Sequence, residues 1–262
     1  MWYKDAEEFK TLNGYEIEKQ WYPRVTKILD IKAKPGLDNF FKEVESYAKV
    51  EEVKQKSAEH GSRVHELLQK SLTGEAVEAP EDLAPALQAF EKFNQEAKIF
   101  FHPEFVERRI WSGRYRYSGT IDALAWIGGK CGVLDIKTSA RFYSEYNLQT
   151  AAYFVALQEF EVKRALSLPR EVETRWILRV DQRQPCRKCE AFLREKGGRS
   201  TIRNGRGNGG CADTEHEWGT AEGDVELKEF PYVHKDMRAF AAAKILWEWE
   251  NDYWLRQIGY SR

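Results

Sequence analysis

The first hundred residues have a polar start followed by apolar side chains at helical spacing. Residues 1–20 are polar with scattered aromatic side chains, and we expect an extended or loosely docked arm. A short helix is expected at 26–29, with its apolar side chains facing inward. Three longer segments repeat apolar residues every three or four positions, which is typical of amphipathic helices. These segments are 37–59, 61–72 and 81–101.

From residue 104 the spacing changes to the alternation of β-strands. Strands are predicted at 104–111, 115–126, 130–137, 174–180 and 225–232. Gly128 and Gly129 form the expected hairpin turn between the second and third strands. Helical spacing returns at 144–160 and 235–258. This order of elements predicts an α/β domain with a central mixed sheet flanked by helices.

Length, charge and cysteine content exclude several classes of protein. The 262 residues suffice for one large domain over 21–258 with an insertion at 182–222. A net charge of −1 provides no global field for DNA, so any nucleic-acid surface must be local. No apolar run approaches the roughly 20 residues of a membrane span, and the acidic start lacks a signal-peptide region. Four cysteines do not make a disulfide scaffold, so we expect a cytoplasmic protein without a membrane partner.

Two carboxylates and a lysine occur on the predicted strands. Asp135 and Lys137 share one face because alternate strand residues point the same way. Asp122 lies on the neighbouring strand, so its carboxylate can converge with that of Asp135. Mg²⁺ and Mn²⁺ prefer oxygen ligands, and the Ile136 carbonyl can supply a third. Lys137 would then stabilise charge on a scissile phosphate. The alternative is a solvated ion pair at a strand end, because D-x-K triplets are frequent by chance.

The motifs resemble the PD-(D/E)XK nuclease superfamily. The core motifs are Gly119-Thr120-Ile121-Asp122, Leu134-Asp135-Ile136-Lys137-Thr138, and Gln149 followed by Tyr153. Two upstream stretches resemble its RecB-like exonuclease branch, which includes phage exonucleases and the mitochondrial genome maintenance exonuclease. They are Gly61-x3-His65-Glu66 and Tyr22-Pro23-x-Val25-Thr26-x-Ile28-Leu29 followed by Lys34-Pro35. Ile121 replaces the proline of the superfamily name. The resemblance implies a restriction-endonuclease-like core.

The resemblance also implies roles for individual residues. Asp122, Asp135 and His65 would be metal ligands, and Lys137 the catalytic lysine; a lone helical histidine otherwise caps or fills a core. Glu107 fits a glutamate near the metal or its water, with an exposed strand charge as the alternative. Gln149 and Tyr153 lie one helical turn apart and would position the DNA strand or brace the site, although Tyr153 also suits a core.

The insertion carries a second candidate metal site. Its possible ligands form a C-x2-C…C-x4-H pattern of three thiolates and one imidazole, which suits tetrahedral zinc. They are Cys186, Cys189, Cys211 and His216. Unpaired surface cysteines are one alternative. An iron–sulfur cluster, which some RecB-like nucleases carry, is another. The resemblance implies one cysteine upstream of the core and three closely spaced cysteines after it, and the gap from Cys189 to Cys211 does not fit that arrangement. Cys131 is most simply a small core residue.

The insertion is also the most basic stretch of the chain. Between residues 183 and 206 its cations are faced only by Glu190 and Glu195. The cations are Arg183, Arg187, Lys188, Arg194, Lys196, Arg199, Arg203 and Arg206. Such a cluster can contact DNA phosphates without reading sequence. A solvated flexible loop is the alternative.

Together, the motifs predict a metal-dependent DNA exonuclease with Mg²⁺ or Mn²⁺ as the catalytic ion and Zn²⁺ as a possible structural one. By resemblance, its substrates would be single-stranded DNA or duplex ends in recombination, repair or phage DNA metabolism. The alternatives are a DNA-binding factor without catalytic turnover and a structure-specific endonuclease.

Overall fold

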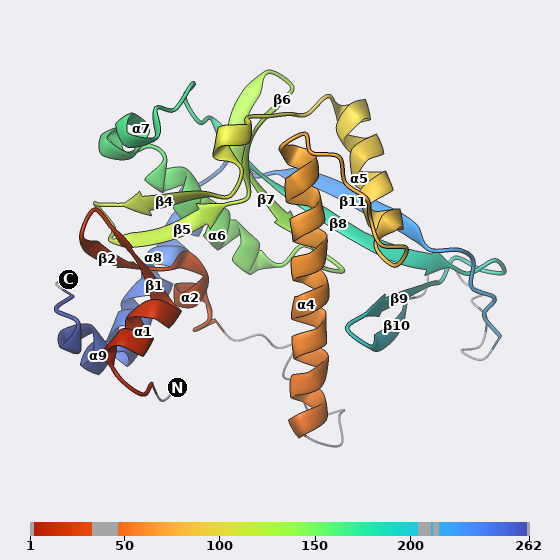
Figure 1. Ribbon diagram of the computed structural model, residues 1–262, viewed down its shortest axis with the longest axis horizontal. Coiled ribbons are helices and arrows are strands. Elements are labelled where there is room, and N and C mark those ends of the chain that lie inside the picture. Colours follow the sequence, from red (N-terminus) through yellow and green to blue (C-terminus); the bar gives the residue numbers. More distant parts are fainter. Residues whose placement is uncertain (1–2, 33–46, 204–210, 212–214, 261–262) are drawn as a thin grey trace.

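The computed structural model describes residues 3–32, 47–203, 211 and 215–260 (Figure 1). Its helices are α1 (Ala6–Asn13), α2 (Val25–Leu29), α4 (Tyr47–Leu72), α5 (Ala84–Ala97), α6 (Ser144–Ala156), α7 (Phe160–Leu166), α8 (His234–Glu250) and α9 (Asp252–Gln257), with a 3₁₀ turn η1 (Pro103–Phe105). Its strands are β1 (Gly14–Ile17), β2 (Gln20–Pro23), β3 (Phe100–Phe101), β4 (Arg108–Ser112), β5 (Tyr117–Ile121), β6 (Ala123–Ile127), β7 (Lys130–Lys137), β8 (Thr174–Pro185), β9 (Phe192–Lys196), β10 (Arg199–Arg203) and β11 (Glu222–Glu229).

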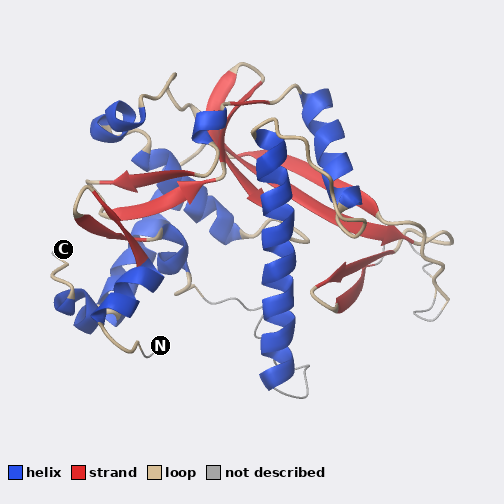
Figure 2. Cartoon of the chain, viewed as in Figure 1, coloured by secondary structure: helices blue, strands red, loops and turns tan. Residues whose placement is uncertain are grey.

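The main sheet has seven strands in the order β10-β9-β8-β7-β6-β3, with β11 also paired to β8. β7 and β8 run parallel, while the other pairs in this sheet are antiparallel. Helices lie on both sides of the sheet (Figure 2). The predicted α/β class with a central mixed sheet is therefore confirmed. β1–β2 and β4–β5 form two smaller sheets. None of the described helices combines the length and apolar character needed to cross a membrane.

β7 runs through the middle of the molecule and is buried on both faces. Every residue from Cys131 to Ile136 is buried. Val133 packs into a first core, which also contains Phe9, Ile121 and Phe240 from outside the main sheet. Leu134 and Ile136 pack into a second core, which is formed with α4 and α5. This double burial explains why the strand reads as an almost continuous apolar run.

The N-terminal region differs from the predicted arm. Residues 6–17 form α1 and β1, and the side chain of Phe9 is fully buried in the first core. The predicted helices at 37–59 and 61–72 are not separate, because α4 passes without interruption through Gly61. Residues 33–46, including Lys34-Pro35 and the first apolar positions of the predicted helix, lie outside the described residues.

Several predicted elements are interrupted. The predicted helix at 81–101 ends at Ala97, and Phe100 and Phe101 form β3. The segment 104–111 contains η1 and then β4, because Glu107 has a positive φ of 51° between them. The segment 115–126 becomes β5 and β6, which separate at Asp122. The last helix divides at Asn251 into α8 and α9. The paired strands around the insertion are confirmed, and β8 continues to Pro185, five residues beyond its predicted end.

Candidate functional site

Asp122 occupies the point where the chain passes from β5 into β6. Its backbone carbonyl accepts a hydrogen bond from the Glu107 amide at 3.0 Å. Its Oδ2 atom accepts the N–H of Ile136 on β7. Since Ala123 is opposite Leu134 in the antiparallel pair, Asp122 lies opposite Asp135. The structure thus brings together the two aspartates that the motif proposes as ligands.

Asp135 and Lys137 are connected to α6 through Gln149. Lys137 Nζ lies 2.7 Å from Asp135 Oδ2 and donates to Gln149 Oε1 at 3.1 Å. The Gln149 amide nitrogen lies 2.9 Å from Asp135 Oδ1 and 3.1 Å from the Tyr153 hydroxyl. One amide side chain therefore holds the lysine and the carboxylate together. Tyr153 is buried in the first core, and its hydroxyl supports the Gln149 amide from that side.

The electrostatics of this group are set by burial and by opposite charges. Burial, together with the Asp122 carboxylate, raises the pKa of Asp135 to about 7, although Lys137 opposes the increase. Burial alone would lower the pKa of Lys137, but Asp135 and Asp122 outweigh it and raise that pKa. The lysine is therefore charged at neutral pH and fixed in position by its partners.

Glu107 and His65 approach the same region from other elements. Burial and the nearby Asp122 raise the pKa of Glu107 to about 7, and Gln69 of α4 donates to its Oε1 atom. Burial lowers the pKa of His65 on α4, while the Asp122 charge and a contact with the Ile136 backbone oppose the decrease. Glu107 is exposed, as the alternative expected, but it lies in the turn before β4 rather than in a strand, and its carboxylate has Gln69 as a partner.

A cavity of about 550 Å³ opens beside these residues. Its walls come from α4, from the end of β7 with the turn that follows, from α6, and from β9 of the insertion. His65, Lys137, Thr138, Tyr146 and Lys196 line it. The cavity places the Lys137 ammonium where a molecule from solution can reach it.

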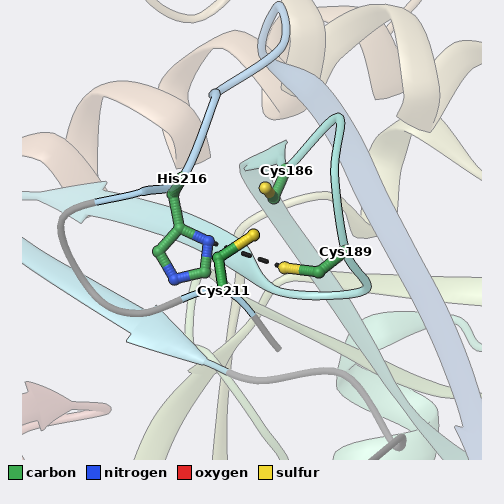
Figure 3. Close-up of side chains that lie close together, drawn as sticks. All are labelled: Cys186, Cys189, Cys211 and His216. Carbon is green, nitrogen blue, oxygen red and sulfur yellow. Dashed lines mark hydrogen bonds between the residues drawn. The ribbon is translucent and has the colours of Figure 1, made fainter. Parts of the chain in front are cut away.

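The insertion gathers its four predicted metal ligands. One ligand atom from each lies within 4.8 Å of every other (Figure 3), and the residues are Cys186, Cys189, Cys211 and His216. This arrangement can hold a metal ion such as zinc. Among the described residues, this is the one group of at least three His, Cys, Asp or Glu side chains whose ligand atoms converge this closely. His65 and the carboxylates of Glu107, Asp122 and Asp135 do not converge as closely.

The surroundings of the quartet suit a metal with thiolate ligands. Backbone amides of Lys188 and Ala191 each point at a cysteine sulfur from 3.4 Å. Burial opposes ionisation of Cys186, but His216 and several backbone N–H groups outweigh it and lower its pKa to about 6. The His216 ring stacks on Trp218 and brings Nδ1 to 3.5 Å from the Cys189 sulfur. Cys131 lies in the first core and takes no part.

Comparison with known proteins gives no relative from which a function could be transferred: no family model and no curated protein sequence matches this chain. The resemblance to the nuclease superfamily therefore rests on the motif residues and their geometry alone.

Two residues contact the site although the motifs did not place them there; Lys196 was expected only as one cation of the basic insertion. Gln69 lies one helical turn after His65, and this spacing could have indicated it. Lys196 hydrogen-bonds to Thr138, which lies 58 residues earlier in the chain. No sequence pattern points to such a long-range contact, so only the folded structure reveals it.

Proposed function

We propose that the protein is a metal-dependent deoxyribonuclease that acts as an exonuclease on single-stranded DNA or duplex ends. The observation that carries this proposal is the 2.7 Å contact between Lys137 Nζ and Asp135 Oδ2, beside a cavity that Lys137 and His65 both line. An ammonium fixed next to a buried carboxylate suits the stabilisation of charge on a phosphodiester.

The residues around Lys137 fit a divalent cation. Asp122 and Asp135 lie near the Lys137 ammonium, and Glu107 lies near both aspartates. Burial and mutual repulsion raise the pKa of Glu107 and of Asp135. Asp122 and Asp135, the Ile136 carbonyl and His65 would hold Mg²⁺ or Mn²⁺, with Glu107 nearby. Such an ion, when bound, lowers the pKa of a coordinated water and polarises the phosphate.

The protein side chains would then supply positioning and charge. Lys137 binds a non-bridging phosphate oxygen and stabilises the negative charge that grows as water attacks phosphorus in line. The water oxygen bonds to phosphorus and gives up one proton to solvent, the bond from phosphorus to the leaving oxygen breaks, and that oxygen takes up a proton from solvent. Gln149 keeps Lys137 and Asp135 oriented because it accepts from the first and donates to the second.

The test uses end-labelled linear DNA, both single- and double-stranded, and closed circular single-stranded DNA, with Mg²⁺ or Mn²⁺. Wild type is compared with Lys137→Ala and Asp135→Asn, each of which should lose about 100-fold or more in rate. Lys130→Ala is the matched control, because Lys130 lies at the opposite end of β7 in an exposed ion pair with Glu229.

Each result has a distinct meaning. If wild type leaves all substrates intact, the nuclease proposal fails, and DNA binding without cleavage would favour the non-catalytic alternative. Equal cleavage of circular and linear DNA would replace exonuclease with endonuclease. Full activity in both site variants would refute the assignment of Lys137 and Asp135.

The second proposed ion is a structural Zn²⁺ in the insertion. Three thiolates and one imidazole fill a tetrahedral coordination shell and leave no position for substrate. In the described part of the insertion only Cys186 and Ala191 are buried. With so small a core, metal binding would supply much of the folding free energy of this segment.

A further inference from the structure

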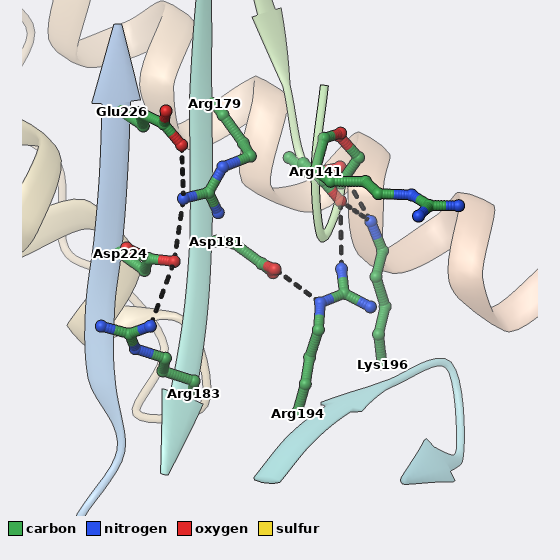
Figure 4. A network of polar contacts seen from close by, with 10 residues as sticks. Arg141, Arg179, Asp181, Arg183, Arg194, Lys196, Asp224 and Glu226 are labelled. Carbon is green, nitrogen blue, oxygen red and sulfur yellow. Dashed lines mark hydrogen bonds and ion pairs between the residues drawn. The ribbon is translucent and has the colours of Figure 1, made fainter. Parts of the chain in front are cut away.

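The hairpin β9–β10 returns from the insertion to the candidate active site. Lys196, at the end of β9, donates to the backbone carbonyl of Thr138 and to Thr138 Oγ1 at 2.9 Å. Thr138 directly follows Lys137. Figure 4 shows Arg194 and Lys196 pointing from β9 toward the loop that carries Arg141. The insertion therefore forms part of the wall of the cavity rather than a separate module.

Two glycines permit this close approach. A Cβ atom at Gly61 of α4 would lie 3.1 Å from Thr138 Oγ1 and 3.7 Å from Lys196 Nζ. A Cβ atom at Gly197, in the hairpin turn, would lie 2.2 Å from Ser57 Oγ on α4, and Gly197 also has a positive φ of 61°. The hairpin is thus fitted against α4 at the position that brings Lys196 to Thr138.

The turn between Pro185 and Phe192, which carries Cys186 and Cys189, sets the direction of β9. The chain leaves β8 at Pro185 and re-pairs with it at once, with Pro185 opposite Phe192. Between them, the Cys186 amide donates to the Ala191 carbonyl at 2.8 Å and closes the turn. The ligands Cys186 and Cys189 lie inside this turn, so a bound metal would hold β9 on its path to the cavity.

Lys196 differs in its charge partners from its basic neighbours. Arg194 pairs with Asp181, and Arg183 pairs with Glu222 at 3.5 Å. No carboxylate of the described residues lies within ion-pair distance of Lys196. Thr138 supplies its acceptors, and an ammonium has three N–H donors. Burial, and then the nearby Arg194, lower the pKa of Lys196 to about 8. An anionic ligand in the cavity would supply the countercharge that the Lys196 ammonium lacks and would offset the cost of its desolvation.

We propose that Lys196 is a second phosphate-binding lysine, which the inserted hairpin brings to the same cavity as Lys137. It binds a backbone phosphate of the single DNA strand next to the one that is cleaved. This inference rests on the proposed nuclease function, because it assigns a role in substrate binding at that site. The contact is electrostatic and independent of base sequence.

The experiment measures binding of a labelled single-stranded oligonucleotide over a series of salt concentrations, with Ca²⁺ replacing Mg²⁺ to suppress cleavage. Lys196→Ala should weaken binding about tenfold and lower the salt slope by about 0.7, the value for one lost phosphate contact. Lys196→Arg should retain most of the affinity. Lys92→Ala on α5 is the matched control, because it removes one exposed cation elsewhere.

A neutral variant separates phosphate binding from a purely structural role. Lys196→Gln keeps an N–H donor for Thr138 but has no charge. If it restores wild-type affinity and salt slope, Lys196 acts only through Thr138 and the inference fails. Cleavage by wild type together with unchanged binding by Lys196→Ala also overturns the inference, but leaves the nuclease proposal intact. If wild type neither binds nor cleaves DNA, both are refuted.

Discussion

A Cβ atom at position 119 would lie 2.3 Å from Cε1 of Tyr153, so Gly119 on β5 leaves the space that the tyrosine ring fills. Gly119→Ala should displace this ring and the Gln149 amide bonded to it. We expect a loss of about 1–3 kcal/mol in unfolding free energy and a clear loss of nuclease activity, since small displacements of positioning groups are costly. Denaturant unfolding and the cleavage assay measure the two effects. Gly113→Ala, where the new Cβ has an ordinary 3.7 Å contact, should change neither.

Arg175 is a fully buried cation that connects β8 to two helices. It donates to Thr150 Oγ1 at 3.0 Å on α6 and to the Tyr232 carbonyl at 2.8 Å, and it pairs with Asp236 on α8. Arg175→Met should lower the unfolding free energy by about 3 kcal/mol, because a partly buried carboxylate loses its partner. Arg256→Ala, in an exposed pair with Asp252, should cost less than about 0.5 kcal/mol. Equal stability of both variants would contradict the structural role of Arg175.

Removal of a thiol ligand should release the metal of the insertion. Elemental analysis should find one zinc equivalent in wild type and none in Cys189→Ser, which should also have a lower melting temperature. DNA affinity should fall as in Lys196→Ala, because β9 loses its fixed direction. Cys131→Ala, which creates a small core cavity, should keep its zinc although it is less stable. If purified wild type contains no metal, the structural-zinc proposal is wrong.

The ionisation of Lys196 predicts opposite effects of pH on binding and on stability. Its pKa of about 8 lies below the unfolded value of about 10.4. DNA affinity should therefore fall as pH rises through about 8, because the ammonium loses its proton. Folding stability should rise over the same window, because the unfolded chain binds more protons there. A fall in both would point to unfolding instead.

Comparison with Lys196→Arg isolates this effect from other titrating groups, because arginine stays charged. The titratable and charged groups that face Lys196 are Arg194 on its own strand, Asp181 on β8, and His60 and His65 on α4. Burial and the nearby Lys196 lower the pKa of His60, so it is neutral throughout this window. If wild type and the arginine variant show the same pH dependence, Lys196 is not the group responsible.

Local patterns in the sequence were sufficient to predict many of the helices and strands. The alternation around Asp135 and Lys137 correctly placed both side chains on one face of a strand, and they lie 2.7 Å apart. The short helix α2 buries Ile28 and Leu29 as predicted. Gly61 was misleading: it was expected to open a helix, yet it lies inside one. A glycine costs a helix only about 1 kcal/mol, and here its missing side chain makes room for Thr138.

The remaining features depend on contacts between distant segments. The break at Asp122 is only one residue long, so the alternation of β5 and β6 reads as one strand. The alternative that the basic insertion is a flexible loop is wrong for residues 192–203, which form a hairpin. Arg206 lies outside the described residues. The site of Lys196 depends on how this hairpin packs on α4, and local spacing contains no information about that packing.

The break between β5 and β6 lies between two residues that pack into different cores. Ile121 belongs to the first core and Ala123 to the second, with Asp122 between them. We expect a substitution that shifts one core relative to the other to change the position of Asp122 relative to Asp135. Variants far from the cavity, such as Phe9→Leu in α1, are expected to change the catalytic rate before they unfold the protein. The position of Asp122, and with it the catalytic rate, is therefore expected to depend on how both cores pack.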